Sequence, residues 1–416
     1  MMTKKEKKRV PELRFEGFEE EWESTKLKKI FSRSTKKNSD NISCVLTNSA
    51  SQGIVSQDSY FDRDIANPNN LEGYYVVELN DFVYNPRISN LAPVGPLKRN
   101  RLKKGVMSPL YTVLRPIKGD LNYLESYFES NNWHYYMKSV ANYGARFDRM
   151  NITISDFENL PVIHPSLSEQ QKIATFLTSI DTRIQQLEKK KTLLEQYKKG
   201  VMQKIFSQEI RFKPALSGVE VDDDGKEFGE WEEKRLGDIG IFKSGTGFSN
   251  SEQGGKEGTP FYKVSDMNLL GNEDKMKSSN NYVTQYQVSD LKYKVIKEHS
   301  IIFAKVGAAI FLERKRLASN FLIDNNMMAF TPKFNVDFCK YLFHTLRLSK
   351  YAQVGALPSY NASDLKIIKV EIPTSLEEQT KIAHFLSALD RKIAAMDGQI
   401  EKTKEWKKGL LQKMFV

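Results

Sequence analysis

Two stretches of the chain carry the apolar pattern of long helices. In each, apolar residues recur at alternating spacings of three and four positions, which is the spacing of a coiled-coil seam. The pattern predicts one helix at residues 165–207 and another at 374–416. The seam residues of the first are Leu177, Ile180, Ile184, Leu187, Leu194, Val201 and Ile205, and those of the second are Leu386, Leu389, Ile393, Met396, Ile400, Leu410 and Met414. Lys191, Lys198, Thr403 and Lys407 interrupt the seam.

A helix-start signal opens each stretch. Ser166-x-x-Glu169 and Ser375-x-x-Glu378 have the spacing of a capping box, in which the Ser accepts from a free backbone N–H and the Glu reaches back to the N–H of the Ser. Two matched helices, each following its own globular half, favour pairing with each other over lying on their own domains. A pseudo-twofold relation that puts the two domains at opposite ends requires that this helix pair be antiparallel.

The two stretches also repeat each other in sequence. The first reads P-S-L-S-E-Q-Q-K-I-A-T-F-L-T-S-I-D and the second T-S-L-E-E-Q-T-K-I-A-H-F-L-S-A-L-D, and adding 209 to a residue number carries Gln170 to Gln379. A second match opens each half, E-L-R-F at 12–15 against E-I-R-F at 209–212. One unit is therefore used twice, and the segments between the matches differ. A duplicated frame with two different inserts suggests two different ligands held at a set distance.

The inserts have a mixed pattern. Short β-branched or aromatic runs, such as 74–77, 107–114, 301–304 and 327–330, are broken by Asn, Gly and Pro, which is typical of α/β domains. We therefore predict a mixed α/β fold, with two globular domains separated by two long helices in an antiparallel coiled coil. The expected segments are a basic tail at 1–11, a domain at 12–164, a helical spacer at 165–207, a linker at 208–225, a domain at 226–373 and a helical spacer at 374–416.

Charge and composition narrow the class of protein. Lys and Arg number 63 against 52 Asp and Glu, leaving a net charge of +11, which favours an anionic partner such as nucleic acid. The two cysteines, Cys44 and Cys339, exclude a disulfide framework and fit a reducing cytoplasm. The basic start has no apolar core of a signal peptide, and no run is long enough to span a bilayer, so we expect a cytoplasmic protein without a membrane partner.

The sequence lacks the motifs of a self-sufficient enzyme. Gly245-Thr246-Gly247 begins like a dinucleotide loop, but Asn250 stands where the third glycine belongs. The five histidines are scattered without the spacing of metal ligands. Tyr84-Asn85-Pro86-Arg87 only partly matches the N-P-P-[YF] loop of amino-methyltransferases. We therefore expect no catalytic residue, no metal site and no cofactor bound by this chain.

Both inserts instead carry clusters of basic, amide and aromatic residues. Arg and Lys neutralise phosphates, and Arg and Asn read base edges through paired hydrogen bonds. Our candidates for DNA contact in the first insert are Arg33, Lys36, Tyr84, Asn85, Arg87, Lys98, Arg99, Arg101 and Arg146, and those in the second are Lys243, Ser244, Thr246, Lys305, Arg314, Arg316, Asn325, Tyr360 and Asn361.

The repeated L-x-E-Q-x-K-I-A-x-F-L-x-x-[IL]-D segment and the E-[LI]-R-F openings resemble the specificity subunit of type I restriction–modification systems. This resemblance covers essentially the whole chain. It implies that each globular segment is a target recognition domain for one half of a bipartite, asymmetric duplex DNA sequence. It also implies that the helices set the spacing and dock two methyltransferase subunits, to which two motor-nuclease subunits add.

Under this resemblance, catalysis belongs to the partner subunits. They would use S-adenosylmethionine for adenine methylation, and ATP with Mg2+ for translocation and cleavage. The chain would be the non-catalytic member of that complex. A non-catalytic adaptor whose basic domains bind RNA or acidic protein is the alternative, and salt-dependent, sequence-specific binding to duplex DNA separates the two.

Overall fold

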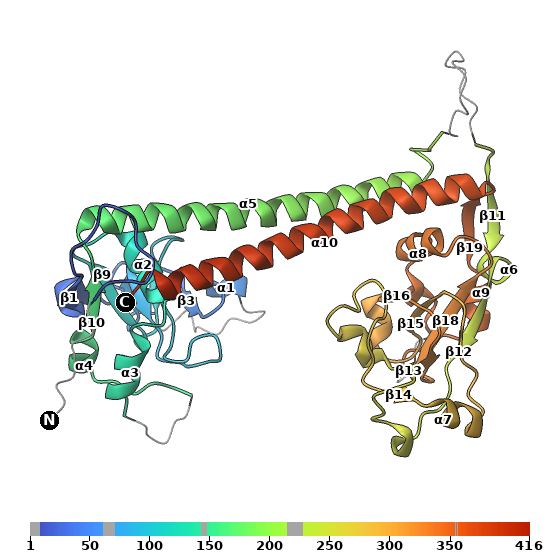
Figure 1. Ribbon diagram of the computed structural model, residues 1–416, viewed down its shortest axis with the longest axis horizontal. Helices are drawn as coiled ribbons and strands as arrows, with labels where there is room; N and C mark the ends of the chain where they lie inside the picture. The colour runs from blue at the N-terminus through green and yellow to red at the C-terminus, as the bar shows by residue number, and fades with distance from the viewer. Residues whose placement is uncertain (1–8, 61–70, 143–147, 214–227, 354, 356) are drawn as a thin grey trace, which may run out of the picture. The chain divides into compact units, whose positions relative to one another are not determined.

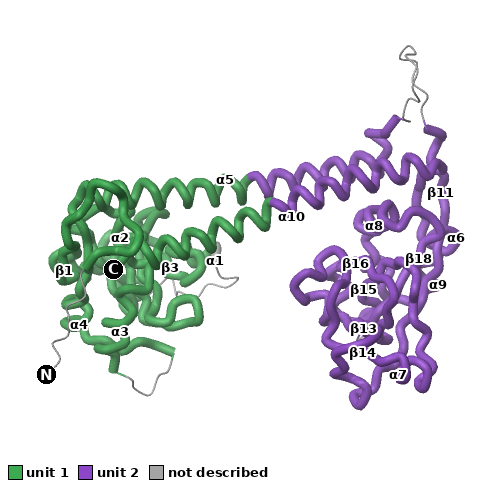
Figure 2. The backbone as a smooth tube through the Cα atoms, in the orientation of Figure 1, with its two compact units in different colours: residues 1–189, 396–416 green, residues 190–395 purple. Residues whose placement is uncertain are grey.

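The computed structural model describes residues 9–60, 71–142, 148–213, 228–353, 355 and 357–416. The chain forms two compact units, one of residues 1–189 with 396–416 and one of residues 190–395 (Figure 2). Each unit holds one globular insert and part of both long helices. Candidate residue Arg146 and most of the expected linker at 208–225 lie outside the described residues.

A four-stranded antiparallel sheet with the strand order β2-β9-β6-β7 is the centre of the first unit. Figure 1 labels its strand β9. Its strands are β2 (Phe31–Ser34), β9 (Thr112–Pro116), β6 (Phe82–Tyr84) and β7 (Leu97–Arg99). Three further antiparallel pairs join β1 (Glu23–Lys26) to β10 (Pro161–His164), β3 (Leu46–Ser49) to β4 (Gly53–Ser56), and β5 (Tyr75–Val77) to β8 (Gly105–Met107). The short helices are η1 (Leu27–Lys29), α1 (Gln57–Tyr60), α2 (Leu121–Glu129), α3 (His134–Val140) and α4 (Ile154–Glu158).

The second unit has a four-stranded antiparallel sheet with the order β12-β18-β15-β16. Its strands are β12 (Gly240–Ser244), β18 (Met327–Pro332), β15 (Ser300–Ala304) and β16 (Lys315–Ala318). Beside it lie a sheet of β14 (Tyr282–Val283), β13 (Thr259–Tyr262) and β17 (Leu322–Ile323), and a pair of β11 (Trp231–Arg235) and β19 (Lys369–Pro373). The short helices are α6 (Leu236–Ile239), η3 (Asn250–Glu252), η4 (Val264–Asn268), α7 (Gln285–Asp290), η5 (Ala308–Leu312), α8 (Val336–Thr345), η6 (Leu348–Tyr351) and α9 (Ala362–Lys366).

The two central sheets share one topology although their sequences differ. In each, the first strand pairs with the fourth, the fourth with the second, and the second with the third, always antiparallel. Strand β6 therefore corresponds to β15, and the β6–β7 loop (residues 85–96) corresponds to the β15–β16 loop (residues 305–314). The inserts look unrelated in sequence, yet they are versions of one domain.

Two long helices carry these domains, α5 (Leu167–Phe206) with 40 residues and α10 (Leu376–Lys413) with 38. In the first unit, Asp181 of α5 pairs with Lys407 of α10 at 2.7 Å, and Glu188 pairs with Lys404 at 2.8 Å. The partner's number falls as the number along α5 rises, so the helices run antiparallel. The predicted fold class, with two α/β domains and a pair of long antiparallel helices, is confirmed.

The core of each unit joins its domain to the helix pair. In the first unit, Trp22, Phe31 and Tyr123 share one buried cluster with Leu177 of α5 and Leu410 of α10. In the second, a buried cluster unites residues of β11, the central sheet and α8 with both long helices; it includes Trp231, Phe330, Phe338, Ile205, Leu386 and Leu389. Each domain is thereby fixed to the helices by apolar burial.

The predicted capping boxes do not form in full, because neither glutamate reaches back to its serine among the described contacts. The Glu169 carboxylate instead accepts two hydrogen bonds from Arg14, at 2.8 and 2.9 Å, and Glu378 accepts two from Arg211, at 3.1 and 2.9 Å. Of the two serine hydroxyls, that of Ser375 accepts a helix N–H, the one of Glu378 at 3.4 Å, whereas that of Ser166 has no such contact within the described part of the chain. A forked guanidinium binds a buried carboxylate more strongly than one backbone N–H does.

Most of the predicted β runs form strands. Runs 74–77, 301–304 and 327–330 fall on β5, β15 and β18. The run at 107–114 divides between β8 and β9, because a turn closed by a hydrogen bond from Tyr111 N–H to the Ser108 carbonyl at 3.0 Å separates them.

Candidate nucleic-acid interface

The β6–β7 loop of the first unit rests on two buried polar side chains. Tyr84 Oη donates to the Val94 carbonyl at 2.8 Å, and burial raises the pKa of Tyr84 far above its usual value. Asn85 Nδ2 donates to the Asn48 carbonyl, and Asn85 Oδ1 accepts from the Arg87 N–H, both at 3.0 Å. Tyr84 and Asn85 were candidates for DNA contact, but they are buried and shape the loop from inside.

Arg87 lies on the exposed face of this loop. It stands opposite Arg149 in an antiparallel bridge. Two backbone hydrogen bonds flank this bridge: Ile88 N–H donates to the Asp148 carbonyl at 3.0 Å, and Met150 N–H donates to the Pro86 carbonyl at 2.8 Å. Like charges placed opposite each other across a strand pair are unfavourable, and Asp148, 3.7 Å from Arg149, offsets part of this repulsion. An anion such as a phosphate at this position would relieve the remainder.

The β15–β16 loop of the second unit has the same kind of support. Tyr360 is buried and donates from its hydroxyl to the Ala304 carbonyl at 2.5 Å, so this candidate also lies beneath the loop. Lys305 follows strand β15 and is half-buried, and Val306 pairs with Ser359 in an antiparallel bridge. Asn361 is exposed at the start of α9, where its N–H donates to Asp364 at 2.8 Å.

A second cluster of candidates meets beside this loop. Thr246 pairs with Asp324 in a parallel bridge, and the backbone of Gly245 approaches so closely that a Cβ there would lie 1.8 Å from the Asp324 carbonyl oxygen. Ser244 and Asn325 are exposed next to this contact. The fold thus brings Ser244, Thr246 and Asn325 together from segments that are far apart in the sequence.

The three remaining candidate cations of the second unit have partners inside the protein. Lys243 pairs with Glu298 at 2.8 Å, Arg314 donates to Asn268, and Arg316 donates to the Lys315 carbonyl at 3.1 Å. Burial, followed by the neighbouring Arg314, lowers the pKa of Arg316.

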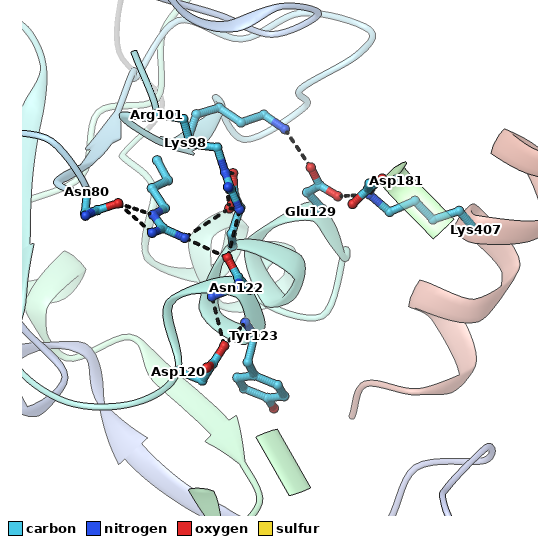
Figure 3. A network of polar contacts seen from close by, with 11 residues as sticks. Asn80, Lys98, Arg101, Asp120, Asn122, Tyr123, Glu129, Asp181 and Lys407 are labelled. Carbon is cyan, nitrogen blue, oxygen red and sulfur yellow. Dashed lines mark hydrogen bonds and ion pairs between the residues drawn. The ribbon is translucent and has the colours of Figure 1, made fainter. Parts of the chain in front are cut away.

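The basic cluster of the first insert lies in an internal network at the other end of the sheet (Figure 3). Lys98 pairs with Glu129 at 3.7 Å, and Arg101 donates to Glu125 at 2.6 to 3.0 Å. Arg99 donates to Asn80 and Asn122. Glu129 and Glu125 of α2 thus bind Lys98 and Arg101, and Asn122 of α2 binds Arg99, so the network links β7 and the residue two positions beyond it to that helix.

This network continues into the long helices. Lys407 of α10 lies 2.8 Å from Glu129 and 2.7 Å from Asp181 of α5 (Figure 3). Burial alone would lower the pKa of Lys407, but Glu129 and Asp181 raise it above its usual value. The first domain is therefore attached to both helices through one ammonium group.

Arg33 and Lys36 are exposed at and just beyond the end of β2, where Lys36 pairs with Asp40 at 3.3 Å.

The seam candidates are mostly buried: Leu177, Ile180, Ile184, Leu187, Leu386, Leu389 and Ile400 lie in the interior, while Leu194, Ile393 and Met396 are half-buried. The pattern of three and four thus follows the inner face of each helix.

The repeated motifs bind each other. In the first unit, Arg14 pairs with Glu169, and Phe15 packs edge-on against Phe176 with ring centroids 5.6 Å apart. In the second unit, Arg211 pairs with Glu378, and Phe212 packs against Phe385, again at 5.6 Å. Each E-[LI]-R-F segment is therefore fastened to the helix whose E-Q-x-K-I-A-x-F segment it accompanies.

The family of the chain follows from a comparison with protein-family models. The model described as the type I restriction modification DNA specificity domain matches twice, at residues 19–196 and 229–405. The chain belongs to this family. Each match takes in one α/β insert and most of the long helix that follows it, so the structural repeat and the family repeat coincide. Specificity subunits of this family are the non-catalytic members of type I restriction–modification complexes.

Curated relatives carry the same description. The type I restriction enzyme MjaIX specificity subunit of Methanocaldococcus jannaschii is 27% identical over 356 residues, covering 82% of this chain and 74% of the relative. The putative MjaX specificity subunit of the same organism is 25% identical over 291 residues, covering 67% of this chain and 64% of the relative.

Solved structures share the fold. The specificity subunit of a type I system from M. genitalium aligns with a TM-score of 0.52 at 16% identity, covering 98% of this chain and 99% of that one. A chain from a study of complex assembly and conformational transition of the type I system aligns with a TM-score of 0.58 at 15% identity, covering 95% and 97%.

Sequence reasoning missed Arg149. It belongs to no motif, and only the bridge to Arg87 reveals it. Within the described residues, no group of His, Cys, Asp and Glu could hold a metal ion, and no helix is long and apolar enough to cross a membrane.

Proposed function

We propose that this specificity subunit reads a bipartite duplex DNA sequence, one half with each α/β domain. The observation that carries the proposal is the shared sheet topology: two domains of one design present loops of different sequence on a repeated frame. Domains that read the same half-site would not need different loops. Arg87 and Arg149 in the first domain, and Lys305, Thr246 and Asn325 in the second, supply phosphate and base-edge contacts.

The helices dock two copies of a methyltransferase subunit. Adding 209 carries Tyr197 to Trp406, and these aromatic side chains on α5 and α10 are both 53% exposed. The same offset carries Leu167 to Leu376, which are also exposed. Exposed aromatic residues are frequent anchors of protein interfaces, and the repetition of one set on both helices suits two copies of one partner.

The reactions belong to the partners. The methyltransferase subunits would transfer a methyl group from S-adenosylmethionine to adenine, and two motor-nuclease subunits would use ATP and Mg2+. This chain would determine which DNA sequence is bound and how far apart the two halves of that sequence lie.

Sequencing of methylated adenines tests the proposal directly. Cells that carry this chain with its methyltransferase should methylate one bipartite motif with an unspecified gap, and cells that lack this chain should not. Methylation of a continuous motif, or methylation that does not depend on this chain, would contradict it.

Replacing Tyr197 and Trp406 with Ala one at a time should lower the methyltransferase content of the purified complex from two subunits to one.

A further inference from the structure

Each central sheet presents a bulky apolar side chain on one particular loop. Leu91, at the tip of the β6–β7 loop, is 74% exposed, and Phe311, in the corresponding β15–β16 loop, is 61% exposed. Single exposed apolar residues need no explanation. Here, however, two inserts with unrelated sequences place such a residue in the same loop of the same topology.

The first loop holds Leu91 in a rigid setting. Ser89 and Ala92 exchange backbone hydrogen bonds at 3.0 and 3.1 Å, and Gly95 N–H donates to the Ala92 carbonyl at 3.0 Å. Gly95 has a φ of +82°, and a Cβ there would lie 2.1 Å from the Asn85 carbonyl oxygen, so only glycine fits. Ala92 and Val94 are buried on either side of this turn, which leaves Leu91 outside a fixed backbone.

The second loop also holds its exposed apolar side chain on a hydrogen-bonded backbone, but with different contacts. Gly307, at a φ of +84°, donates its N–H to the Pro358 carbonyl at 2.8 Å, and Ile310 anchors the turn in the core. The Glu313 carboxylate closes the loop by accepting from Ser349 N–H at 2.7 Å and from Lys315 at 2.6 Å. Phe311, directly after the anchor, faces outward.

Both loops lie at the sheet end far from their helix pair. In the first domain, β6 runs toward the loop while its neighbour β9 runs toward Gly119 and Asp120, where Asp120 N–H donates to Gln170 of α5 at 3.0 Å. In the second, β18 leads toward Asn335, which donates to Thr380 of α10 at 3.3 Å. Each loop also has cations beside it, Arg87 in the first domain and Lys305 in the second.

We infer that Leu91 and Phe311 insert between base pairs of bound duplex DNA, one at each half-site. The inference rests on the proposed function and adds a physical mode of reading to it. Apolar wedges that enter a base step unstack it and kink the duplex, and the cost depends on the step. A flanking Arg or Lys would hold the phosphates on either side. The rigid backbone means that little entropy is lost when the tip enters the stack.

The test uses the complex of this chain with its methyltransferase subunits and a duplex that carries the methylated motif. 2-Aminopurine, whose fluorescence rises on unstacking, is placed at each position of both half-sites in turn. The adenines that are methylated should respond in every variant, because the enzyme extrudes its target base. In the unsubstituted complex we expect one additional responding step in each half-site.

The variants are Leu91→Ser and Phe311→Ser, and their matched controls are Ile117→Ser and Ile241→Ser, which replace exposed residues at the opposite ends of the same two sheets. Leu91→Ser should remove the additional signal from the first domain's half-site only, and Phe311→Ser from the other only. Each should weaken DNA binding by about ten- to a hundredfold, the worth of burying one large apolar side chain. The controls should change neither, and far-UV circular dichroism should show all four folded.

Three results would overturn the inference. The motif could be bound with no response beyond the methylated adenines, in which case the domains read DNA without insertion. Leu91→Ser could instead reduce the methyltransferase content of the complex, which would make the loop a protein contact. If the unsubstituted complex shows no preference for its motif, the proposed function fails together with the insertion. Leu91→Met, which keeps a long apolar side chain, should retain the additional fluorescence signal that Leu91→Ser loses.

Discussion

Lys407 of α10 lies 2.7 Å from Asp181 of α5, and the same pair occurs again with the helices exchanged, because Lys198 of α5 donates to Asp390 of α10. Adding 209 carries Asp181 to Asp390 and Lys198 to Lys407. Both lysines interrupt the apolar seam, and both bind an acid of the opposite helix. An apolar seam alone tolerates sliding by a heptad, whereas these pairs define one register.

Loss of the Lys407 ammonium should weaken the first unit. Lys407→Met leaves Glu129 and Asp181 without their shared cation, and we expect the free energy of unfolding to fall by about 1.5–3 kcal/mol. Lys404→Met, in a pair with Glu188 in which both side chains are about half exposed, should cost under about 1 kcal/mol. Urea unfolding followed by circular dichroism compares the two. Equal losses would mean that Glu129 adds nothing to the Lys407 pair.

The same site predicts a response to acid. Burial would raise the pKa of Glu129, but Lys407 and Lys98 outweigh it and hold this pKa below the usual value near 4.5. A carboxyl with a depressed folded pKa stabilises the fold above its unfolded pKa and loses that contribution as the pH falls through the folded value. The stability difference between the unsubstituted protein and Glu129→Gln should therefore be constant near pH 7 and shrink below about pH 4.5. A difference that grows on acidification would contradict this.

The two repeated tryptophans should differ in their need for a polar group. Trp231 Nε1 donates to Glu378 at 3.2 Å, whereas Trp22 Nε1 is buried without a partner among the described residues. Trp231→Phe should therefore cost about 1.5–3 kcal/mol more than Trp22→Phe. Urea midpoints of the two variants measure the difference. A larger loss for Trp22→Phe would show that packing, and not the hydrogen bond, distinguishes the sites.

The length of the helices should set the gap between the half-sites. Seven residues inserted after both Glu188 and Asp397, positions related by the offset of 209, lengthen each helix by about 10 Å and keep the seam nearly in phase. At about 3.4 Å per base pair, the unread gap should grow by about three pairs while both half-sites stay the same. Sequencing of methylated adenines reads the outcome. The insertion after Glu188 alone should impair assembly, because the lysine–aspartate pairs resist a shift of one helix.

Exchange of one domain should change one half of the motif. Replacing residues 16–160 with the equivalent domain of another family member leaves the Arg14 to Glu169 contact in place, so the frame should still form. The methylated motif should then change in one half only, as read by sequencing. A change in both halves would show that the domains do not read independently.

The sequence predicted the two long helices better than the residues that contact DNA. A seam that repeats over many turns has a strong helical signal, and residues such as Leu177 and Leu386 identify the buried face. Strands of three to five residues leave little periodicity, so the common topology of the two sheets was not foreseeable. The Lys98 to Arg101 cluster was expected to contact DNA, but charge along a sequence does not reveal that Glu125 and Glu129 lie opposite it.

The junction between the helix ends and the E-[LI]-R-F segments has a topological consequence. Ile210 N–H donates to the Lys204 carbonyl at 3.2 Å where the chain continues out of α5, and Leu13 N–H donates to the Lys413 carbonyl at 2.9 Å where no peptide bond joins the two segments. The same backbone contact thus forms within one continuous segment in the second unit and between two segments far apart in the sequence in the first. Because the contact does not need a direct covalent link, we expect a permuted chain that is opened between Lys204 and Ile210 to form both junctions.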